Sequence, residues 1–382
     1  MQVITDTDAL AAFSRELRDK PFAAVDTEFM REKTYWPILC LIQAAADGVE
    51  AIIDPMAEGI DLSPFLEVMA DKNVVKVFHA ARQDLEIFYK LMGEVPAPLF
   101  DSQIAAMACG YGDQIGYEPL MRNLLNARID KGSRFTDWAR RPLTEAQLSY
   151  ALSDVTHLRD AYKLLKRNLE EDNRTSWVAE EAESLLDPDL YLIKPHDAWK
   201  RLKLRNMRPG DLGPLLKLAE WREREAQERD LPRGRVLSDE SIFELARLKP
   251  GTPQELGRAR SISKGFERSK TGAALLDMVA EGRRMEKDTL PSIGQKQHRA
   301  TPPADVVDLL KVLLKKQCEE FSVAPKLIAS SADLEAIALD DDADVRALQG
   351  WRHEIFGMFA LQLKRGEIAL KLTGGAVQII PT

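Results

Sequence analysis

Apolar positions in the first hundred residues alternate between short strand-like runs and helical spacings. A run of β-branched or small apolar residues bounded by turn residues is typical of a strand, and a three-to-four residue spacing is typical of a helix. Repeated strand and helix predict an α/β domain with a mixed sheet, in which the first three strands form a meander. The predicted strands are Phe22 to Val25 with its continuation, Ile38 to Ala46, Glu50 to Asp54 and Val74 to Phe78.

Beyond Pro98 the pattern is mainly helical. Thr144 and Gln147 have capping-box spacing and open a helix that should run to about Leu169. From Trp177 onward helical periodicity dominates and strand-like runs nearly vanish. The second half is therefore predicted to be all-α.

Composition limits the class of protein. At 382 residues the chain should contain two or three domains, and 45% hydrophobic with 30% charged residues is ordinary for a globular protein. No run reaches the roughly 20 apolar residues of a membrane span, the N-terminus lacks a secretory signal, and the three cysteines are far apart. We expect a cytoplasmic protein with no membrane partner. The net charge of −8 argues against simple coating of nucleic acid, although local patches can be hidden in that sum.

Acidic residues supply the candidate chemistry. Asp26 and Glu28 follow a buried strand and emerge on the same face of it, so they require a compensating cation, either a basic side chain or a metal ion. Asp84 lies near the start of a helix, and Asp154 lies one turn after Tyr150 on the long helix. If the long helix crosses the sheet, the four acids could hold two divalent ions about 3.5 to 4 Å apart and hydrolyse a phosphodiester.

Each acid also has a simpler interpretation. Asp26 and Glu28 could meet a basic partner, and Asp84 could be favoured by the helix dipole. Tyr150 and Asp154 could decorate a solvated helix face. The joint pattern favours the metal site.

Three segments resemble the exonuclease motifs of the DEDD superfamily of 3′ to 5′ exonucleases: VDTEF from Val25, HAARQDLEIF from His79 and YALSDV from Tyr150. The longer segments DTEFMREKTYWPILCLIQ, DSQIAAMACG and DWARRPLTEAQLSYALSDVTHL resemble the ribonuclease D family, roughly over residues 1 to 170. Trp36 departs from the Tyr frequent in that family. Ser149 and Tyr150 place the resemblance in the Tyr branch of the superfamily rather than the His branch.

The resemblance implies a ribonuclease H-like exonuclease domain with two divalent ions, Mg²⁺ or Mn²⁺. Asp26, Glu28 and Asp154 would hold the first ion, with Asp26 bridging to the second and Asp84 acting on the second through water. The phenol of Tyr150 would orient the attacking water.

Three further residues are candidates for substrate binding. Phe29 and Met30 follow the first two acids and could stack against terminal bases or pack in the core. His79 could touch the substrate or cap the helix that follows it.

The segments WRE at Trp221, DLPRGRVLSDE and LKPGTPQEL resemble the helical HRDC domain, the helicase and ribonuclease D C-terminal domain. A faint second copy is expected near the C-terminus. The predicted organisation is an exonuclease domain at 1–175, a connecting segment at 176–210, an HRDC domain at 211–290, a linker at 291–303 and a diverged HRDC-like domain at 304–382.

Charges in the second half bear on nucleic-acid binding. Lysines and arginines gather in two clusters, which would grip phosphates if each shared one face, or would be solvated helix faces offset by nearby glutamates. Four aspartates make the last region a poor phosphate binder, namely Asp340, Asp341, Asp342 and Asp344. The clusters are Lys200, Arg201, Lys203, Arg205 and Arg208, and Arg258, Arg260, Lys264, Arg268 and Lys270.

These features predict a 3′ to 5′ exoribonuclease that releases nucleoside 5′-monophosphates and, by the resemblance, trims tRNA precursors with 3′ trailers. We expect a monomer. Two alternatives stay open here, a DNA 3′ to 5′ exonuclease and a non-catalytic nucleic-acid-binding module.

Overall fold

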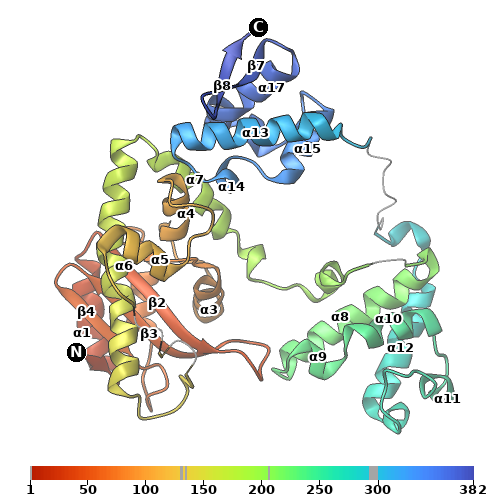
Figure 1. The fold of residues 1–382 in the computed structure, drawn as a ribbon. Coiled ribbons are helices and arrows are strands. Elements are labelled where there is room, and N and C mark those ends of the chain that lie inside the picture. The colour runs from red at the N-terminus through yellow and green to blue at the C-terminus, as the bar shows by residue number, and fades with distance from the viewer. Residues whose placement is uncertain (1, 130–131, 134–135, 205–206, 292–299) are drawn as a thin grey trace. The chain divides into compact units, whose positions relative to one another are not determined.

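The structure, a computed structural model, describes residues 2–129, 132–133, 136–204, 207–291 and 300–382. The chain folds into two compact units (Figure 1). The first comprises Met1–Glu28, Leu39–Pro188 and His298–Thr382, and the second comprises Phe29–Ile38 and Asp189–Gln297. Arg205 of the first predicted basic cluster and most of the predicted linker 291–303 lie outside the described residues. Within the described residues, no helix has both the length and the apolar composition needed to cross a membrane.

A six-stranded sheet forms the centre of the first unit. Its strand order is β1-β4-β3-β2-β5-β6. Parallel pairs join β1 to β4, β2 to β5 and β5 to β6, whereas β3 and β4 are antiparallel, so the predicted mixed sheet is confirmed. The strands are β1 (Val3–Ile4), β2 (Phe22–Met30), β3 (Ile38–Ala46), β4 (Val49–Ile53), β5 (Val75–Phe78) and β6 (Leu99–Asp101). Strands β1 and β6 were not predicted because two or three residues are too few to show an alternating pattern.

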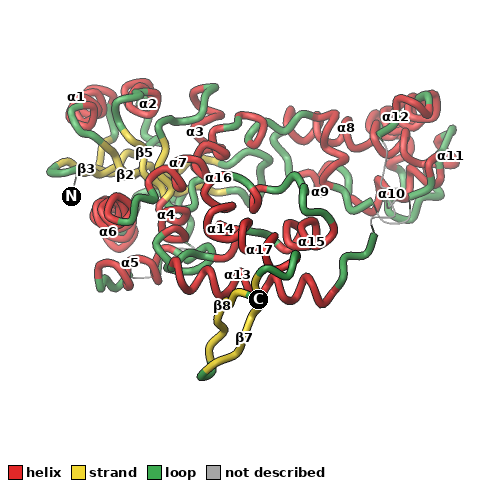
Figure 2. The backbone as a smooth tube through the Cα atoms, turned by 90° about the horizontal axis from the view of Figure 1, so that it is seen from above, coloured by secondary structure: helices red, strands yellow, loops and turns green. Residues whose placement is uncertain are grey.

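Helices cover both faces of this sheet. They are α1 (Thr7–Arg18), α2 (Ser63–Ala70), α3 (Arg82–Met92), α4 (Ser102–Ala108), α5 (Tyr117–Leu125), α6 (Glu145–Glu171) and α7 (Thr175–Glu183). Figure 2 shows α1, α2 and α3 on one face of the sheet and α6 on the other. Because apolar neighbours lie on both sides of β2, its residues Ala23, Ala24 and Val25 are fully buried.

Local sequence fixes where α4 and α6 begin. The Asp101 carboxylate accepts hydrogen bonds from the backbone of Gln103 and Ile104 at the start of α4. Thr144 and Gln147 form the predicted capping box at the start of α6. Helix α6 then packs Leu158 and Tyr162 against Phe22 of β2, with the rings of Phe22 and Tyr162 4.5 Å apart. This packing holds the middle of α6 across the sheet.

The C-terminal region of the first unit is mainly helical. It contains α13 (Ala304–Phe321), α14 (Pro325–Ile328), α15 (Ser331–Leu339), a 3₁₀ turn (Arg346–Leu348), α16 (Gly350–Arg352), a π-helical turn (His353–Gly357) and α17 (Met358–Lys364). These elements share one hydrophobic core with α4, α5, α6 and α7. The rings of Trp177 and Trp351 stack 4.1 Å apart across that core. The C-terminal helices are thus built onto the exonuclease part of the chain.

A hairpin at the C-terminus differs from the all-α prediction for this half. Strands β7 (Ile368–Thr373) and β8 (Ala376–Pro381) pair in antiparallel register around Gly374 and Gly375. Both glycines have positive φ, which a two-residue hairpin turn requires. The alternating apolar residues on either side of this Gly-Gly pair are the sequence signal for the hairpin.

The second unit is helical. It contains α8 (Leu212–Glu228), α9 (Arg233–Val236), α10 (Asp239–Leu248), α11 (Pro253–Leu256) and α12 (Lys270–Arg284), with 3₁₀ turns at Ser184–Leu186, Pro188–Leu190, Pro195–Arg201, Pro209–Asp211, Phe266–Arg268 and Lys287–Thr289 in and before it. Helices α8 and α12 approach closely at Gly213 and Gly282, since a Cβ at Gly213 would lie 2.1 Å from the Gly282 carbonyl oxygen. Ser238 caps α10 as predicted.

Candidate active site

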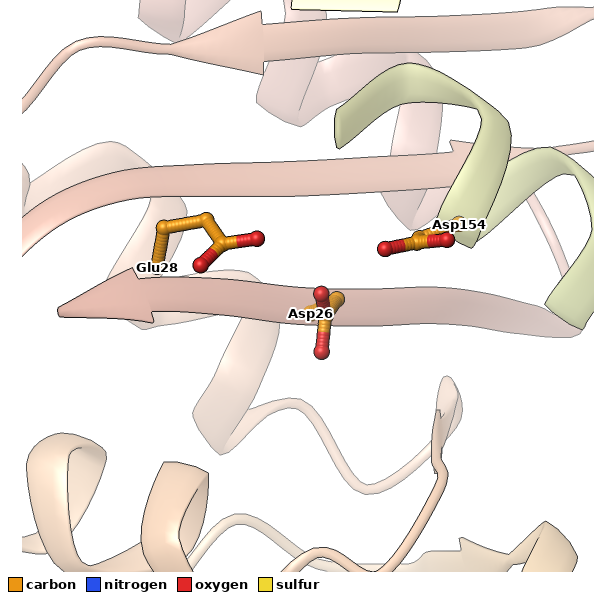
Figure 3. Close-up of side chains that lie close together, drawn as sticks. All are labelled: Asp26, Glu28 and Asp154. Atoms are coloured by element: carbon orange, nitrogen blue, oxygen red, sulfur yellow. The ribbon is translucent and has the colours of Figure 1, made fainter. Parts of the chain in front are cut away.

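Three of the predicted acids meet where α6 crosses β2. Carboxylate oxygens of Asp26, Glu28 and Asp154 all lie within 4.8 Å of one another. Figure 3 shows Asp26 and Glu28 rising from one strand and Asp154 reaching them from the helix. The alternation of side chains along β2 puts Asp26 and Glu28 on the face that α6 covers. The structure therefore assembles a compact, partly buried acidic group from residues 128 positions apart in sequence, Asp26 and Asp154.

Burial and mutual repulsion perturb the protonation of this group. Desolvation and the neighbouring Asp154 carboxylate raise the pKa of Asp26 to about 8. Among the described residues, no lysine or arginine forms an ion pair with Asp26. A divalent cation would offset both the burial of these charges and the repulsion between them. Clustered carboxylate oxygens are also the ligands that Mg²⁺ and Mn²⁺ prefer. The donor set therefore fits a hard divalent ion.

Asp84 stands beside this group rather than in it. Its carboxylate accepts a hydrogen bond from the Thr27 hydroxyl at 2.6 Å, and its side chain is buried. Thr27 lies between Asp26 and Glu28 and points to the other side of the strand. Burial and the charge of Asp26 raise the pKa of Asp84 well above its usual value, so the two carboxyl groups are still close enough to interact. Action of Asp84 on a second ion stays a prediction.

Tyr150 lines the same cavity as Asp26 and Asp154, which measures about 280 Å³. The Asp154 carboxyl group, one helical turn further on, is close enough to interact with its hydroxyl. Burial, followed by the charges of Asp154, Glu28 and Asp26, raises the pKa of this phenol strongly. Tyr150 is therefore protonated at neutral pH and can donate a hydrogen bond into the cavity.

His79 also lines this cavity, and its environment separates the two roles considered for it. Its Nδ1 lies 2.9 Å from the Ser102 hydroxyl, and burial lowers the pKa of the ring. The cap of the following turn is supplied by Asp101, whose carboxylate accepts hydrogen bonds from the backbone of Ala80 and Ala81. Contact between a neutral His79 and the substrate stays a prediction.

Phe29 and Met30 form the end of β2 and are half-buried. They belong to the second unit, whereas Asp26 and Glu28 on the same strand belong to the first. Stacking of Phe29 or Met30 on a substrate base stays a prediction.

Tyr117 is a residue of the cavity that the sequence patterns did not single out. It opens α5, lines the cavity, and donates a hydrogen bond from its hydroxyl to the backbone carbonyl of Asp154. Its ring makes an edge contact with His79, with centroids 5.4 Å apart. The Gly116-Tyr117 pair at a helix start carries no sign of this distant contact, so sequence periodicity could not reveal it.

Comparisons with known proteins show what this chain is similar to. Residues 1–170 match the 3′-5′ exonuclease family, and residues 211–279 match the HRDC domain. The chain is 48% identical over 377 residues to a ribonuclease D of Nitrobacter hamburgensis, and the alignment covers 99% of this chain and 98% of the relative. It is 46% identical over 381 residues to a ribonuclease D of Granulibacter bethesdensis, covering 100% of this chain and 96% of the relative.

Solved structures also resemble this chain. The crystal structure of Escherichia coli RNase D, described as an exoribonuclease involved in structured RNA processing, aligns with a TM-score of 0.81 at 30% identity. That alignment covers 95% of this chain and 98% of the E. coli chain. A protein from Bifidobacterium adolescentis aligns with a TM-score of 0.70 at 21% identity, which supports the fold alone.

Proposed function

The chain belongs to the ribonuclease D family and is a 3′ to 5′ exoribonuclease, and from this premise we propose that it trims the 3′ ends of tRNA precursors by hydrolysis that depends on two divalent metal ions. The proposed products are nucleoside 5′-monophosphates. The observation that carries the proposal is the group of three carboxylates, Asp26, Glu28 and Asp154, within 4.8 Å of one another.

The acidic group would hold the ions. Asp26, Glu28 and Asp154 would bind the first, and Asp26 with Asp84 would bind the second, with Asp84 acting through water. Divalent ions at this position would lower the pKa of a water molecule and offset the charge on the phosphate. The hydrogen bond from Thr27 engages only Oδ1 of Asp84, so the other carboxylate oxygen could contact the water through which Asp84 acts.

Tyr150 would orient the attacking water. Without bound metal, burial and the charges of Asp154, Glu28 and Asp26 raise the pKa of Tyr150, so its hydroxyl keeps its proton at neutral pH. The Tyr150 hydroxyl has both a proton and oxygen lone pairs to offer to a water molecule in the cavity that it lines. Removing this hydroxyl should lower the rate more than the affinity.

A cleavage assay tests the proposal. A tRNA precursor with a labelled 3′ trailer is incubated with the full chain and either Mg²⁺, Mn²⁺ or EDTA. We expect stepwise release of mononucleotides with either metal and none with EDTA. Asp26→Ala and Asp154→Asn should abolish turnover while far-ultraviolet circular dichroism stays unchanged.

Asp160→Asn is the matched control, because Asp160 lies on the same helix and its side chain is 45% exposed. It should cleave like the unmodified chain. Normal turnover of Asp26→Ala or Asp154→Asn would defeat the site assignment, and equal trimming of unrelated 3′ ends would defeat the tRNA assignment alone.

A further inference from the structure

A second and larger cavity lies inside the first unit. It measures about 990 Å³ and is lined by α3, α4 and α7 of the exonuclease part and by α13, α14 and α15 of the C-terminal part. Four basic side chains line it, namely Arg82, Lys311, Lys315 and Lys326. We call it the basic cavity.

The two acids that line the basic cavity, Asp101 and Glu181, already have hydrogen-bond partners within the protein. Asp101 accepts hydrogen bonds from the backbone of Ala80, Ala81 and Gln103. Glu181 accepts hydrogen bonds from Arg346 and Arg352. Glu181 is thus paired with two arginines, whereas Asp101 keeps its negative charge. The four basic side chains outnumber these two acids, so the lining of the cavity has a net positive charge.

The basic side chains, in contrast, keep most of their capacity to bind an anion. No described residue forms an ion pair with Arg82 or Lys315. Lys311 pairs with the exposed Asp308 at 2.9 Å, and Lys326 contacts the neutral amide of Gln114 at 3.1 Å. Surface pairs of this kind are worth about 0 to 1 kcal/mol and exchange readily. The four aspartates between positions 340 and 344, which argue against phosphate binding in this region, are not among the residues that line the cavity.

The floor of the basic cavity is apolar. Ile104 of α4 and Leu314, Leu327 and Leu334 of the C-terminal part contribute to it. A simple anion would gain nothing from such a floor. A nucleotide would gain affinity from it, because its sugar and base can pack against the apolar side chains while its phosphate contacts the lysines.

The basic cavity adjoins the cavity of about 280 Å³ that Asp26, Tyr150 and Asp154 line, which we call the catalytic cavity. His79 lines the catalytic cavity and Ala80 lines the basic cavity, and consecutive Cα atoms are about 3.8 Å apart. The linings of the two cavities therefore meet at the short turn that precedes α3. A strand with its 3′ end in the first is well placed to extend into the second.

We propose that the basic cavity binds the sugar-phosphate backbone of the RNA strand whose 3′ end lies in the catalytic cavity. This inference rests on the proposed function. Lys311 and Lys315, one turn apart on α13, would contact phosphates, and Arg82 would contact the strand where it leaves the catalytic cavity. The C-terminal helices would thus contribute directly to substrate binding.

The test measures binding without cleavage. Fluorescence anisotropy follows two 5′-labelled oligoadenylate RNAs. One has about three nucleotides, fewer than the roughly 4 to 16 of common single-strand sites, and the other has about twelve, within that range. The full chain is used in EDTA over a range of KCl concentrations. The variant is Lys311→Gln/Lys315→Gln, and the matched control is Lys72→Gln/Lys371→Gln, two exposed lysines outside the cavity with the same change in charge.

For the longer RNA, the salt dependence should become shallower by about 1.4 in the slope of log K against log salt, because each phosphate contact on a single strand contributes about 0.7. If the two proteins bind equally near 1 M salt, this corresponds to a roughly 25-fold loss of affinity at 0.1 M. The control variant should bind like the unmodified chain. Equal affinity and slope for the cavity variant and the control would overturn the proposal.

A competing occupant is a free nucleotide. If adenosine 5′-monophosphate binds the unmodified chain and not the cavity variant, while the longer RNA binds both equally, the cavity is a nucleotide site and the proposal is wrong. No part of this test depends on hydrolysis. A failure of the binding proposal can therefore be told apart from a failure of the proposed function, which the cleavage assay measures.

Discussion

The hydroxyl of Tyr35 donates a hydrogen bond to the carboxylate of Glu223, a residue 188 positions later in the chain. The side chain of Glu223 has no exposed surface, and Arg233 donates two hydrogen bonds to it at 2.6 Å. The guanidinium of Arg233 also lies 4.6 Å from the centre of the Tyr35 ring. The segment that follows β2 is thus anchored in the helical second unit by a buried ionic cluster.

Arg233→Ala should destabilise the second unit strongly. The change leaves the buried Glu223 carboxylate without its cation, a loss worth about 3 kcal/mol or more. Tyr35→Phe removes the hydrogen bond that the hydroxyl donates to Glu223 and the two that it accepts from Gln227 and Arg233. The bond to the charged Glu223 alone is worth about 1.5 to 3 kcal/mol, so the variant should lose at least that much stability. Urea unfolding of the full chain, followed by tryptophan fluorescence, measures both.

Arg229→Ala is the control for Arg233→Ala. Arg229 pairs with Glu225 at 3.6 Å on the surface of α8, where such a pair is worth about 0.3 to 0.5 kcal/mol. If Arg233→Ala cost no more than this control, the cluster would not stabilise the second unit.

The cluster of Tyr35, Glu223 and Arg233 also predicts that the folding stability depends on pH. Burial acts to raise the pKa of Glu223, but hydrogen bonds from Arg233 and Tyr35 outweigh it and hold the pKa below the usual 4.5. A depressed pKa in the folded state gives stability that is present above pH 4.5 and is lost as the pH falls through the folded value. The stability advantage of the unmodified chain over Glu223→Gln should therefore shrink below pH 4.5.

Thermal unfolding between pH 3 and 7 measures this advantage. Tyr35, whose pKa is raised to about 12, and Arg233 keep their protons throughout this range, so Glu223 is the group of the cluster that titrates. Glu225→Gln, a change at a partly exposed position on the same helix, should show no such convergence. A constant difference between Glu223→Gln and the unmodified chain would contradict the assignment.

Tyr117→Phe should lower the catalytic rate. The change removes the hydroxyl that holds the backbone carbonyl of Asp154, and a hydrogen bond worth about 1.4 kcal/mol corresponds to a roughly tenfold loss of kcat. The Mg²⁺ concentration for half-maximal rate should rise as well, because Asp154 is a proposed metal ligand. Steady-state kinetics over a Mg²⁺ series measures both effects.

Tyr162→Phe is the matched control. Tyr162 lies on α6 two turns after Asp154, and its ring packs against Phe22 and Phe100. Its variant should keep the unmodified rate and Mg²⁺ dependence. A Tyr117→Phe enzyme with unchanged Mg²⁺ dependence would show that the hydroxyl does not position Asp154.

Sequence patterns predicted the elements of the site because those patterns are local. Alternation along one strand put Asp26 and Glu28 on the same face, and one capping box placed the start of α6. The convergence of Asp154 with these acids depended on the family resemblance, since nothing in the spacing of residues requires the helix to cross the sheet.

The contacts that were missed are non-local. Thr27 and Asp84 are 57 positions apart, and Tyr117 and Asp154 are 37 apart, so no periodicity links them. The core that the C-terminal helices share with α4 to α7 is hidden for the same reason, because apolar faces in a sequence do not say which partner covers them. The C-terminal hairpin, in contrast, carries a local signal in its Gly-Gly turn.

The most direct measurement of the central claim is calorimetric titration of Mn²⁺ into the full chain in the absence of RNA. Asp26, Glu28, Asp84 and Asp154 should bind two ions, and binding should be lost or greatly weakened in Asp26→Asn and retained in Asp160→Asn. Binding of Mn²⁺ to Asp26→Asn with the affinity and stoichiometry of the unmodified chain would contradict the account.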